Sequence, residues 1–356
     1  MGDETAILSR DCIAQAQATM GGWPEYRPSP LLSAPGLAKM LDVGAVWIKD
    51  ESERFGLGGV KALGAPYGLL MMLDDHGVPP GSDACGNYTA VAATDGNHGL
   101  ALAWAAARFG CHARIYVGRD IDVGRTQRIR DAGAEIVVVE GTYDDAVLAA
   151  ERDAETPSVL LVTDTDYTGD LTVTRAIMAG YAILGIEAAR QLKDAGAQPS
   201  HVFLQCGVGG MAAGIATGLW QASGVKPAVI TVEATNAACL DASLRVGKPV
   251  AVPGTLATRM VGLSCGRPSK PAFDILRDLA VGSVIVDDDT AKQVQDTMMA
   301  GVNGDAPLAT GDTGVAGIAG LWQAATSPDL RSRLGLNRQS CVLVVNSEGP
   351  LPPQYA

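Results

Sequence analysis

The sequence predicts an α/β fold of two doubly wound lobes. Apolar runs of strand length alternate with helix-length segments along almost the whole chain, a pattern typical of parallel strands joined by helical crossovers. The 356 residues exceed what one hydrophobic core usually serves, so we expect two lobes. Apolar residues make up 47% of the chain, which is enough to fill both cores.

Apolar runs rich in Val, Ile and Leu predict the buried strands. In chain order they span residues 45–48, 113–117, 135–139, 159–162, 201–205, 228–232, 283–286 and 341–345.

Helices are expected between these strands. Residues 99–110 are rich in Ala and follow the turn TDGN, residues 176–195 form a second helix-length stretch, and residues 211–222 follow a glycine loop. Asp288 or Asp289 is expected to cap a helix that runs into Ala300. The segment 251–270 is rich in Gly, Pro, Thr and Ser and predicts a long, ordered functional loop.

Composition and charge argue against several classes of partner. The net charge of −12 repels phosphate backbones, so we expect no nucleic acid. No run of about 18 apolar residues is present, so we expect no membrane-spanning helix. The N-terminal stretch MGDETAILSRDC lacks the apolar segment of a secretory signal, which favours the cytoplasm. The seven scattered cysteines are expected to be reduced, and four histidines are too few to favour a His-rich metal site.

The stretch SERFGLGGVKALGAPYG places one lysine, Lys61, among small and apolar residues after a glycine-rich turn. Taken alone, Lys61 is a surface lysine whose stem lies on apolar neighbours. Two later motifs favour a different interpretation. They are ATDGNHG, a polar turn that opens a helix at residues 93–99, and QCGVGGMAAG, a glycine loop between a strand and a helix at residues 205–214.

The glycine loop has the properties of a phosphate cradle, because its N–H groups can converge at the start of a helix. It lacks the GKS or GKT of a nucleoside-triphosphate loop and resembles the dinucleotide fingerprint only loosely. Close packing alone would also explain its glycines. A lysine amine, an asparagine at a turn and a phosphate cradle together indicate pyridoxal 5′-phosphate (PLP), whose aldehyde forms a Schiff base with a lysine. Burial is expected to lower the pKa of that amine.

The sequence resembles the fold-type II PLP enzymes, and among them the diaminopropionate ammonia-lyase branch, from Tyr26 to Gly349. The motifs that carry the resemblance, in chain order, are YRPSPLL, IKDESERFGLGGVKALG, ATDGNHGLALAWAA, GAEIVVVEGTYDDAV, GVGGMAAG, VEATNAACL, MVGLSCGRPS and NSEG. KDESERFGLG together with ATDGNHG is specific to that branch, whereas the glycine loop is shared across the fold type.

This resemblance implies a role for each motif residue. Lys61 would form the Schiff base, Asn97 would hydrogen-bond the phenolic oxygen of PLP, and Ser347 would face the pyridine nitrogen and leave it largely unprotonated. The phosphate would be held by backbone N–H groups of Gly207, Val208, Gly209, Gly210 and Met211. Turn chemistry alone would also account for Asn97 and Ser347.

Two acidic residues match the acidic positions of the branch near the substrate. Asp95 would remove the α-proton from one face of the substrate and Lys61 from the other, so that both enantiomers react. Asp164 would orient the distal amino group or tune Asp95. The alternatives are a helix N-cap for Asp95 and a strand-end turn for Asp164.

The chain departs from the branch on the substrate side. Leu100 follows HG where Arg is expected, TGDTG replaces SGESG at residues 310–314, NSEGPL replaces TEGDT near the end, and DTDYTGDLTVTR follows residue 163. The cofactor motifs are intact, so the reaction class is predicted more firmly than the substrate.

We therefore expect an ammonia-lyase that acts by α,β-elimination, with 2,3-diaminopropionate converted to pyruvate and ammonia. Residues 1–75 and 175–356 would form the larger lobe and residues 80–170 the smaller one, in a homodimer. The alternatives are a dehydratase or another β-eliminase, a β-replacement synthase, a non-catalytic binding protein, and a dehydrogenase with Glu233 as the ribose-binding acid.

Overall fold

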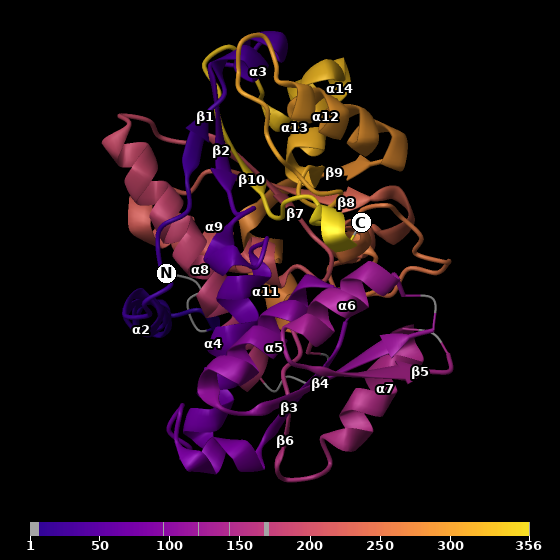
Figure 1. Ribbon diagram of the computed structural model, residues 1–356. Coiled ribbons are helices and arrows are strands. Elements are labelled where there is room, and N and C mark those ends of the chain that lie inside the picture. Colours follow the sequence, from indigo (N-terminus) through magenta and orange to yellow (C-terminus); the bar gives the residue numbers. More distant parts are fainter. Residues whose placement is uncertain (1–6, 95, 120, 142, 167–170, 356) are drawn as a thin grey trace.

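The computed structural model describes residues 7–94, 96–119, 121–141, 143–166 and 171–355, which form two β-sheets flanked by helices (Figure 1). This arrangement confirms the predicted α/β class. The strands are β1 (Leu31–Ser33), β2 (Ala45–Asp50), β3 (Thr89–Ala93), β4 (His112–Gly118), β5 (Glu135–Val139), β6 (Val159–Leu161), β7 (His201–Gln205), β8 (Ala228–Ala234), β9 (Ala280–Val286) and β10 (Cys341–Asn346).

The α-helices precede and separate these strands. They are α2 (Arg10–Gly21), α3 (Pro35–Met40), α4 (Lys61–Asp75), α5 (Asn97–Phe109), α6 (Val123–Asp131), α7 (Tyr143–Asp153), α8 (Thr172–Asp194), α9 (Gly210–Ser223), α10 (Cys239–Val246), α11 (Lys270–Leu279), α12 (Asp288–Ala300), α13 (Ala316–Thr326) and α14 (Pro328–Leu334).

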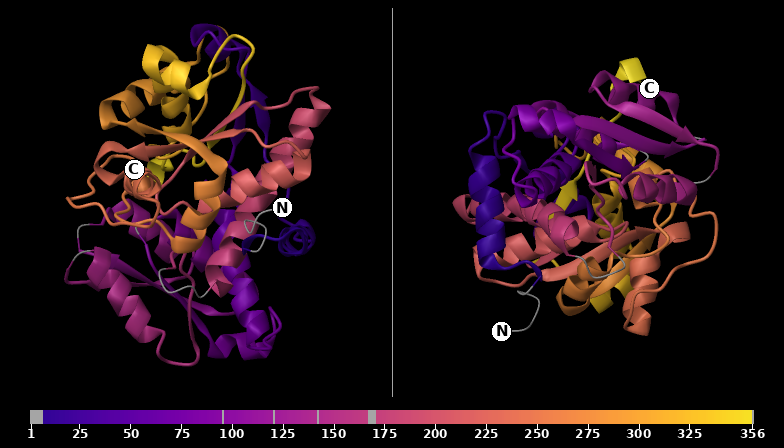
Figure 2. Two further views of the ribbon diagram at one scale, coloured as in Figure 1. Left: turned by 180° about the vertical axis from the view of Figure 1, so that it is seen from behind. Right: turned by 90° about the horizontal axis from the view of Figure 1, so that it is seen from below.

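The larger sheet has the order β1-β2-β10-β7-β8-β9, and only β1 runs antiparallel to its neighbour. Alternate residues of β7 enter two different cores. Val202 and Leu204 belong to the core that includes α8 and α9, whereas Phe203 belongs to the core that includes α12 and α13. Figures 1 and 2 show these helix pairs on opposite sides of the larger sheet. Burial on both faces explains why β7 and β10 are nearly continuous apolar runs.

The smaller sheet has the order β5-β4-β3-β6, with all four strands parallel. Helix α7 covers one face, and α5 covers the other and packs on α4. The central pair α8 and α9 lie so close that a Cβ on Gly218 would be 2.1 Å from the carbonyl oxygen of Ala182. This close approach accounts for the many Gly and Ala residues in α8 and α9.

All the predicted strands are present, with ends that differ by at most three residues. Two strands were not predicted: β1, a three-residue edge strand, and β3, whose sequence TAVAA has little β-branched character yet lies between β4 and β6. The predicted cap of α12 is wrong by one residue, because Asp287 accepts the N–H of Thr290 at 2.7 Å. The division into lobes at 1–75, 80–170 and 175–356 stays a prediction.

Within the described residues, none of the helices has the length and apolar character needed to cross a membrane. The same residues contain no cluster of three or more His, Cys, Asp or Glu side chains arranged to hold a metal ion.

Candidate active site

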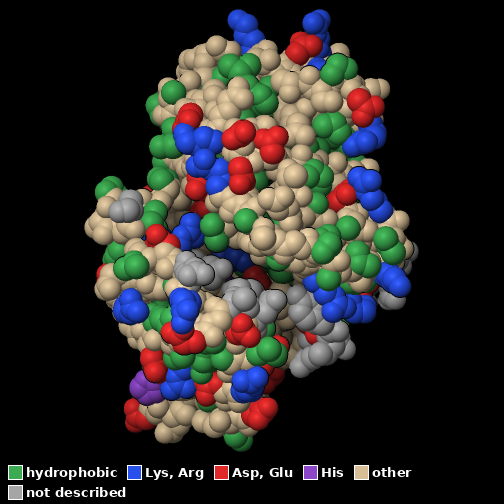
Figure 3. Space-filling view, turned by 90° about the vertical axis from the view of Figure 1, so that its right-hand side faces the viewer, with side chains coloured by type: hydrophobic (Ala, Val, Ile, Leu, Met, Phe, Trp, Pro, Cys, Tyr) green, Lys and Arg blue, Asp and Glu red, His purple; other side chains and the backbone are tan. Residues whose placement is uncertain are grey.

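A cavity of about 520 Å³ lies where the carboxyl ends of β3, β6, β7 and β10 meet. Its wall includes Lys61, Asn97, Asp164, the glycine loop (residues 207–211) and Ser347, and part of the loop 251–270. Figure 3 shows the surface hollowed between the two halves of the molecule, with Lys and Arg side chains beside the hollow. The carboxyl edge of parallel strands is the usual location of ligand sites in α/β proteins.

Lys61 is the first residue of α4 and points into this cavity. Gly56 and Gly58 in the preceding turn have φ values of +71° and +74°, a region that favours glycine. The N–H of Val60 then donates to the carbonyl of Ser347 at 2.9 Å. The glycine turn therefore places the start of α4 next to the end of β10. The amine of Lys61 lies among apolar residues in the sequence because it lines this cavity.

A buried ionic cluster anchors the segment that leads to Lys61. Arg54 donates to both Glu51 and Glu187 at 2.7–3.0 Å, and Lys49 donates to Glu187 at 2.7 Å. Each of these charges has a partner, as burial requires. Through these ion pairs, the motif KDESER fixes the segment between β2 and α4 to helix α8.

Lys61 Nζ donates to Asp164 Oδ2 at 2.7 Å, so the two predicted residues meet. Burial lowers the pKa of Lys61, but the charge and hydrogen bond of Asp164 outweigh it, and the net pKa is raised. Burial raises the pKa of Asp164, and Lys61 and His98 reverse this and lower it to about 2. The expected lowering of the pKa of Lys61 is therefore wrong for this pair. The exposed 28% of the Lys61 side chain faces the cavity.

The glycine loop connects β7 to α9. Gly209 is the N-cap of α9 with φ +94°, and a Cβ on Gly207 would lie 2.8 Å from both Cys265 Sγ and the carbonyl oxygen of Gly262. Within the described residues, the N–H groups of Gly207 and Gly209 have no hydrogen-bond acceptor. The loop is therefore shaped to receive an anion at the helix N-terminus.

Asn97 and Ser347 approach the cavity from the two sheets. Asn97 is the first residue of α5, and its Nδ2 donates to Glu348 Oε2 at 2.5 Å. Ser347 follows β10, is 4% exposed, and its Oγ accepts from Gln205 Nε2 at 2.8 Å. Burial raises the pKa of Glu348, and the positive charge of Arg125 opposes this. Asp95, the remaining predicted residue, lies outside the described residues.

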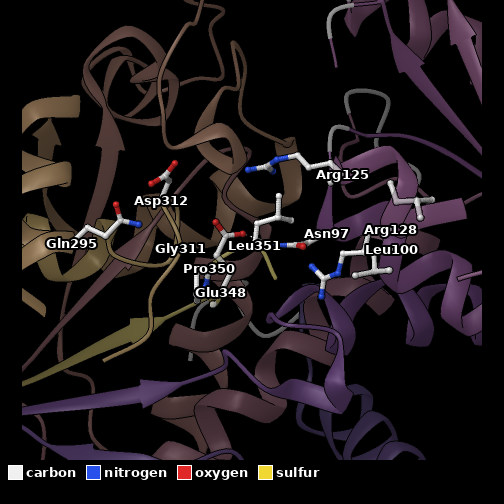
Figure 4. A pocket seen from close by; sticks show the side chains of 13 residues that line it. Asn97, Leu100, Arg125, Arg128, Gln295, Gly311, Asp312, Glu348, Pro350 and Leu351 are labelled. Atoms are coloured by element: carbon white, nitrogen blue, oxygen red, sulfur yellow. Dashed lines mark hydrogen bonds between the residues drawn. The ribbon is translucent and has the colours of Figure 1, made fainter. Parts of the chain in front are cut away.

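A side chamber of about 250 Å³ adjoins the cavity and shares Gly96, Asn97, Arg125 and Glu348 with it. Figure 4 shows Arg125 and Arg128 reaching from the α6 side toward Glu348 and Asp312. The chamber also contains residues from three of the departures: Leu100, Gly311, Asp312, Glu348, Gly349, Pro350 and Leu351.

Three residues of this site were not predicted from the sequence. Gln205 stood in the quoted glycine motif but was treated only as a strand end. Glu348 stood in NSEG beside Ser347. Arg125 gave no signal, because a lone arginine at the start of a helix is usually a surface residue.

The described residues fit PLP. The free N–H groups and small residues of the glycine loop suit its phosphate, the amine of Lys61 lies in the same cavity, and the hydroxyl of Ser347 borders it on another side. A dinucleotide site would need Glu233 as its ribose-binding acid. The Glu233 carboxylate instead accepts the N–H groups of Leu240 and Asp241 at the start of α10.

The family described as “Pyridoxal-phosphate dependent enzyme” matches residues 23–347. The chain belongs to this family. The diaminopropionate ammonia-lyase of Salmonella typhimurium is 34% identical to it, over 93% of this chain and 87% of the relative. A probable D-serine dehydratase of an Acidovorax species is 28% identical, over 89% and 78%.

A crystal structure of the Escherichia coli diaminopropionate ammonia-lyase matches with a TM-score of 0.88 at 31% identity, over 97% of this chain and 90% of that one. It holds an aminoacrylate–PLP azomethine reaction intermediate, and another structure of that enzyme holds D-serine. This PLP enzyme is therefore of fold type II and a carbon–nitrogen lyase of the diaminopropionate ammonia-lyase branch. The resemblance seen in the sequence is confirmed. A dehydrogenase and a non-catalytic binding protein are both inconsistent with this family assignment.

Proposed function

We propose that the enzyme converts 2,3-diaminopropionate and water to pyruvate and two molecules of ammonia. The observation that carries this proposal is the Lys61–Asp164 pair, which faces the glycine loop in one cavity of a chain that is 34% identical to a diaminopropionate ammonia-lyase. The reaction breaks the bond from the β-carbon to its nitrogen after loss of the α-proton, and hydrolysis then releases the α-nitrogen.

In this proposal Lys61 binds PLP covalently, the loop Gly207, Val208, Gly209, Gly210 and Met211 binds its phosphate, Asn97 its phenolic oxygen and Ser347 its ring nitrogen. When bound, PLP supplies an aldehyde that combines with amines and a ring that withdraws electrons from the α-carbon.

The proton transfers are assigned to three side chains. Lys61 and Asp95 remove the α-proton from opposite faces of the substrate, so that each serves one enantiomer. Asp164 already binds an ammonium group, that of Lys61, at 2.7 Å. We propose that it orients the distal ammonium of the substrate in the same way.

Arg125 is the proposed partner of the substrate carboxylate. Its guanidinium borders both the cavity and the side chamber, and it makes no side-chain hydrogen bond or ion pair within the described part of the chain. A Cβ on Gly96 would meet Arg125 Nη1 at 3.0 Å, so the cation packs on the turn between Asp95 and Asn97. A guanidinium in this position can bind a carboxylate with two parallel hydrogen bonds.

The second candidate is a dehydratase that acts on a β-hydroxy amino acid, which the 28% identity to a probable D-serine dehydratase favours. A β-replacement synthase is the third. The test is a panel of both enantiomers of 2,3-diaminopropionate and serine, and O-acetylserine with and without a thiol. Keto acid release measures elimination. We expect the highest kcat/KM with 2,3-diaminopropionate. Higher kcat/KM with serine would identify a dehydratase, and a thioether product would identify a synthase.

We further propose a homodimer, as the resemblance to the branch implies. Sedimentation equilibrium should then give twice the chain mass of 36.6 kDa, and a monomer at micromolar concentration would contradict the proposal. The proposed location is the cytoplasm, because the odd, scattered set of cysteines favours a reducing compartment. Fractionation of the source cells tests this.

A further inference from the structure

Gln205 and Ser347 form a buried hydrogen bond at the edge of the cavity. Gln205 ends β7, Ser347 follows the neighbouring strand β10, and the two are 1% and 4% exposed. Gln205 Nε2 donates to Ser347 Oγ at 2.8 Å. Among the described residues, this amide nitrogen is the only hydrogen-bond partner of the Ser347 hydroxyl.

Backbone carbonyls fix the orientation of the Gln205 amide. Its Nε2 is 3.1 Å from the carbonyl oxygen of Val345 and 3.4 Å from those of Thr313 and Gly314. A flipped amide would set Oε1 against these three oxygens. Oε1 itself is buried and has no hydrogen-bond partner within the described residues. The site therefore tolerates one unsatisfied acceptor, which is costly in a buried position, to keep the N–H donors beside Ser347.

The Gln205 amide limits how the Ser347 hydroxyl can hydrogen-bond. A hydroxyl has one hydrogen to donate and two lone pairs that accept. One lone pair of Ser347 accepts from Gln205, and its hydrogen has no acceptor among the described residues, so this hydrogen is available to the cavity that Ser347 lines. A group that receives this hydrogen must be an acceptor, and an unprotonated pyridine nitrogen is one, whereas a pyridinium is a donor.

We propose that Gln205 is a positioning residue that keeps Ser347 a hydrogen-bond donor and thereby holds the PLP ring nitrogen unprotonated. This inference rests on the proposed assignment of Ser347 to that nitrogen. An unprotonated ring withdraws electrons more weakly than a protonated one, which suits β-elimination and disfavours transamination. The titratable and charged side chains that line the cavity, among the described residues, are Lys61, His98, Arg125, Asp164, Cys265, Arg267 and Glu348.

The test uses holoenzyme loaded with PLP labelled with ¹⁵N in the ring, because the ¹⁵N chemical shift separates pyridine from pyridinium. The wild type should show the unprotonated shift at neutral pH. Gln205→Met, of similar size, removes the donor to Ser347, so the serine oxygen accepts more readily from a protonated ring nitrogen and the pKa of that nitrogen should rise by roughly one unit. Ser347→Asp provides the protonated reference. Gln323→Met is the matched control, because that amide donates to the carbonyl of Ile285 and lies outside the cavity.

Three results would overturn the inference: a protonated nitrogen in the wild type, the same nitrogen pKa in Gln205→Met as in the wild type, or an equal shift in Gln323→Met. If Gln205→Met does not fold, Gln205→Glu replaces it, because an ionised carboxylate cannot donate and should attract the Ser347 hydrogen. Borohydride labelling of Lys61 in the same samples separates this inference from the proposed function. Label on Lys61 with a protonated nitrogen would remove the role of Gln205 alone, whereas absence of label would contradict the cofactor assignment.

Discussion

Replacement of Gly209 by valine tests the glycine loop directly. The φ of Gly209 is +94°, in the left-handed region that costs an L-residue about 1–2 kcal/mol, and a β-branched residue is especially rare there. A Cβ at this position would also lie 3.3 Å from Ala272 Cβ and Leu276 Cδ1. Valine therefore meets both backbone strain and crowding at the point where the loop turns into α9.

The strain is expected to appear in cofactor affinity. Without PLP the loop of the variant can relax, whereas phosphate binding requires its N–H groups to converge in the observed conformation. The backbone term alone, about 1–2 kcal/mol, corresponds to a dissociation constant roughly five- to thirtyfold higher. Crowding against Ala272 and Leu276 adds to it, so we expect PLP affinity to fall by about tenfold or more.

The assay is a titration of the apo-protein with PLP, followed by visible absorption. Gly210→Ala is the matched control, because the nearest atom to a Cβ there is Met178 Cγ at 3.6 Å, an ordinary contact. Thermal unfolding of both apo-variants checks that they fold. Wild-type affinity in Gly209→Val, or an equal loss in Gly210→Ala, would refute the proposed cradle.

The remaining predictions concern charged residues of the site. Borohydride reduction and peptide mapping should place the pyridoxyl group on Lys61, and label on another lysine would end that assignment. Asp164→Asn removes the carboxylate that raises the pKa of Lys61, so the pH dependence of PLP binding by the apo-protein should move to lower pH; an unmoved profile would contradict the pairing. Arg125→Gln should raise KM about ten- to a hundredfold with less effect on kcat, while Arg130→Gln, on the exposed side of α6, keeps the wild-type KM. Asp95→Asn should lower turnover of one enantiomer about a hundredfold or more and keep the cofactor's colour, and equal loss on both enantiomers would instead indicate a structural role.

The sequence was sufficient for those parts of the site that lie within one local motif. A strand, a glycine loop and a helix follow one another at residues 201–223, so the cradle could be recognised without a fold. The same holds for the glycine turn before Lys61. Buried parallel strands were also recognisable, because helices on both faces leave them apolar throughout. Strand β3 was missed because its alanines have weak strand propensity and its position between β4 and β6 decides its structure.

Contacts between distant segments could not be predicted in this way. Lys61 and Asp164 are 103 residues apart, and the prediction for the pKa of Lys61 considered burial without this partner. Gln205 meets Ser347 only because β10 inserts between β2 and β7, a strand order that periodicity does not contain. Local motifs thus predicted the strand, glycine loop and helix that line the cavity, whereas the contacts Lys61–Asp164 and Gln205–Ser347 depend on the topology.

Three of the four departures from the family pattern lie around one space in the structure. Leu100 on α5, Asp312 before α13 and Glu348 after β10 are far apart in sequence, yet all line the side chamber beside Arg125. Independent drift would scatter such changes over the surface, whereas a change in the bound molecule would collect them around one space. The cofactor cavity next to it contains the expected lysine, glycine loop, asparagine and serine. We therefore expect substitutions of Leu100 and Asp312 in this chamber to alter substrate preference while PLP binding persists.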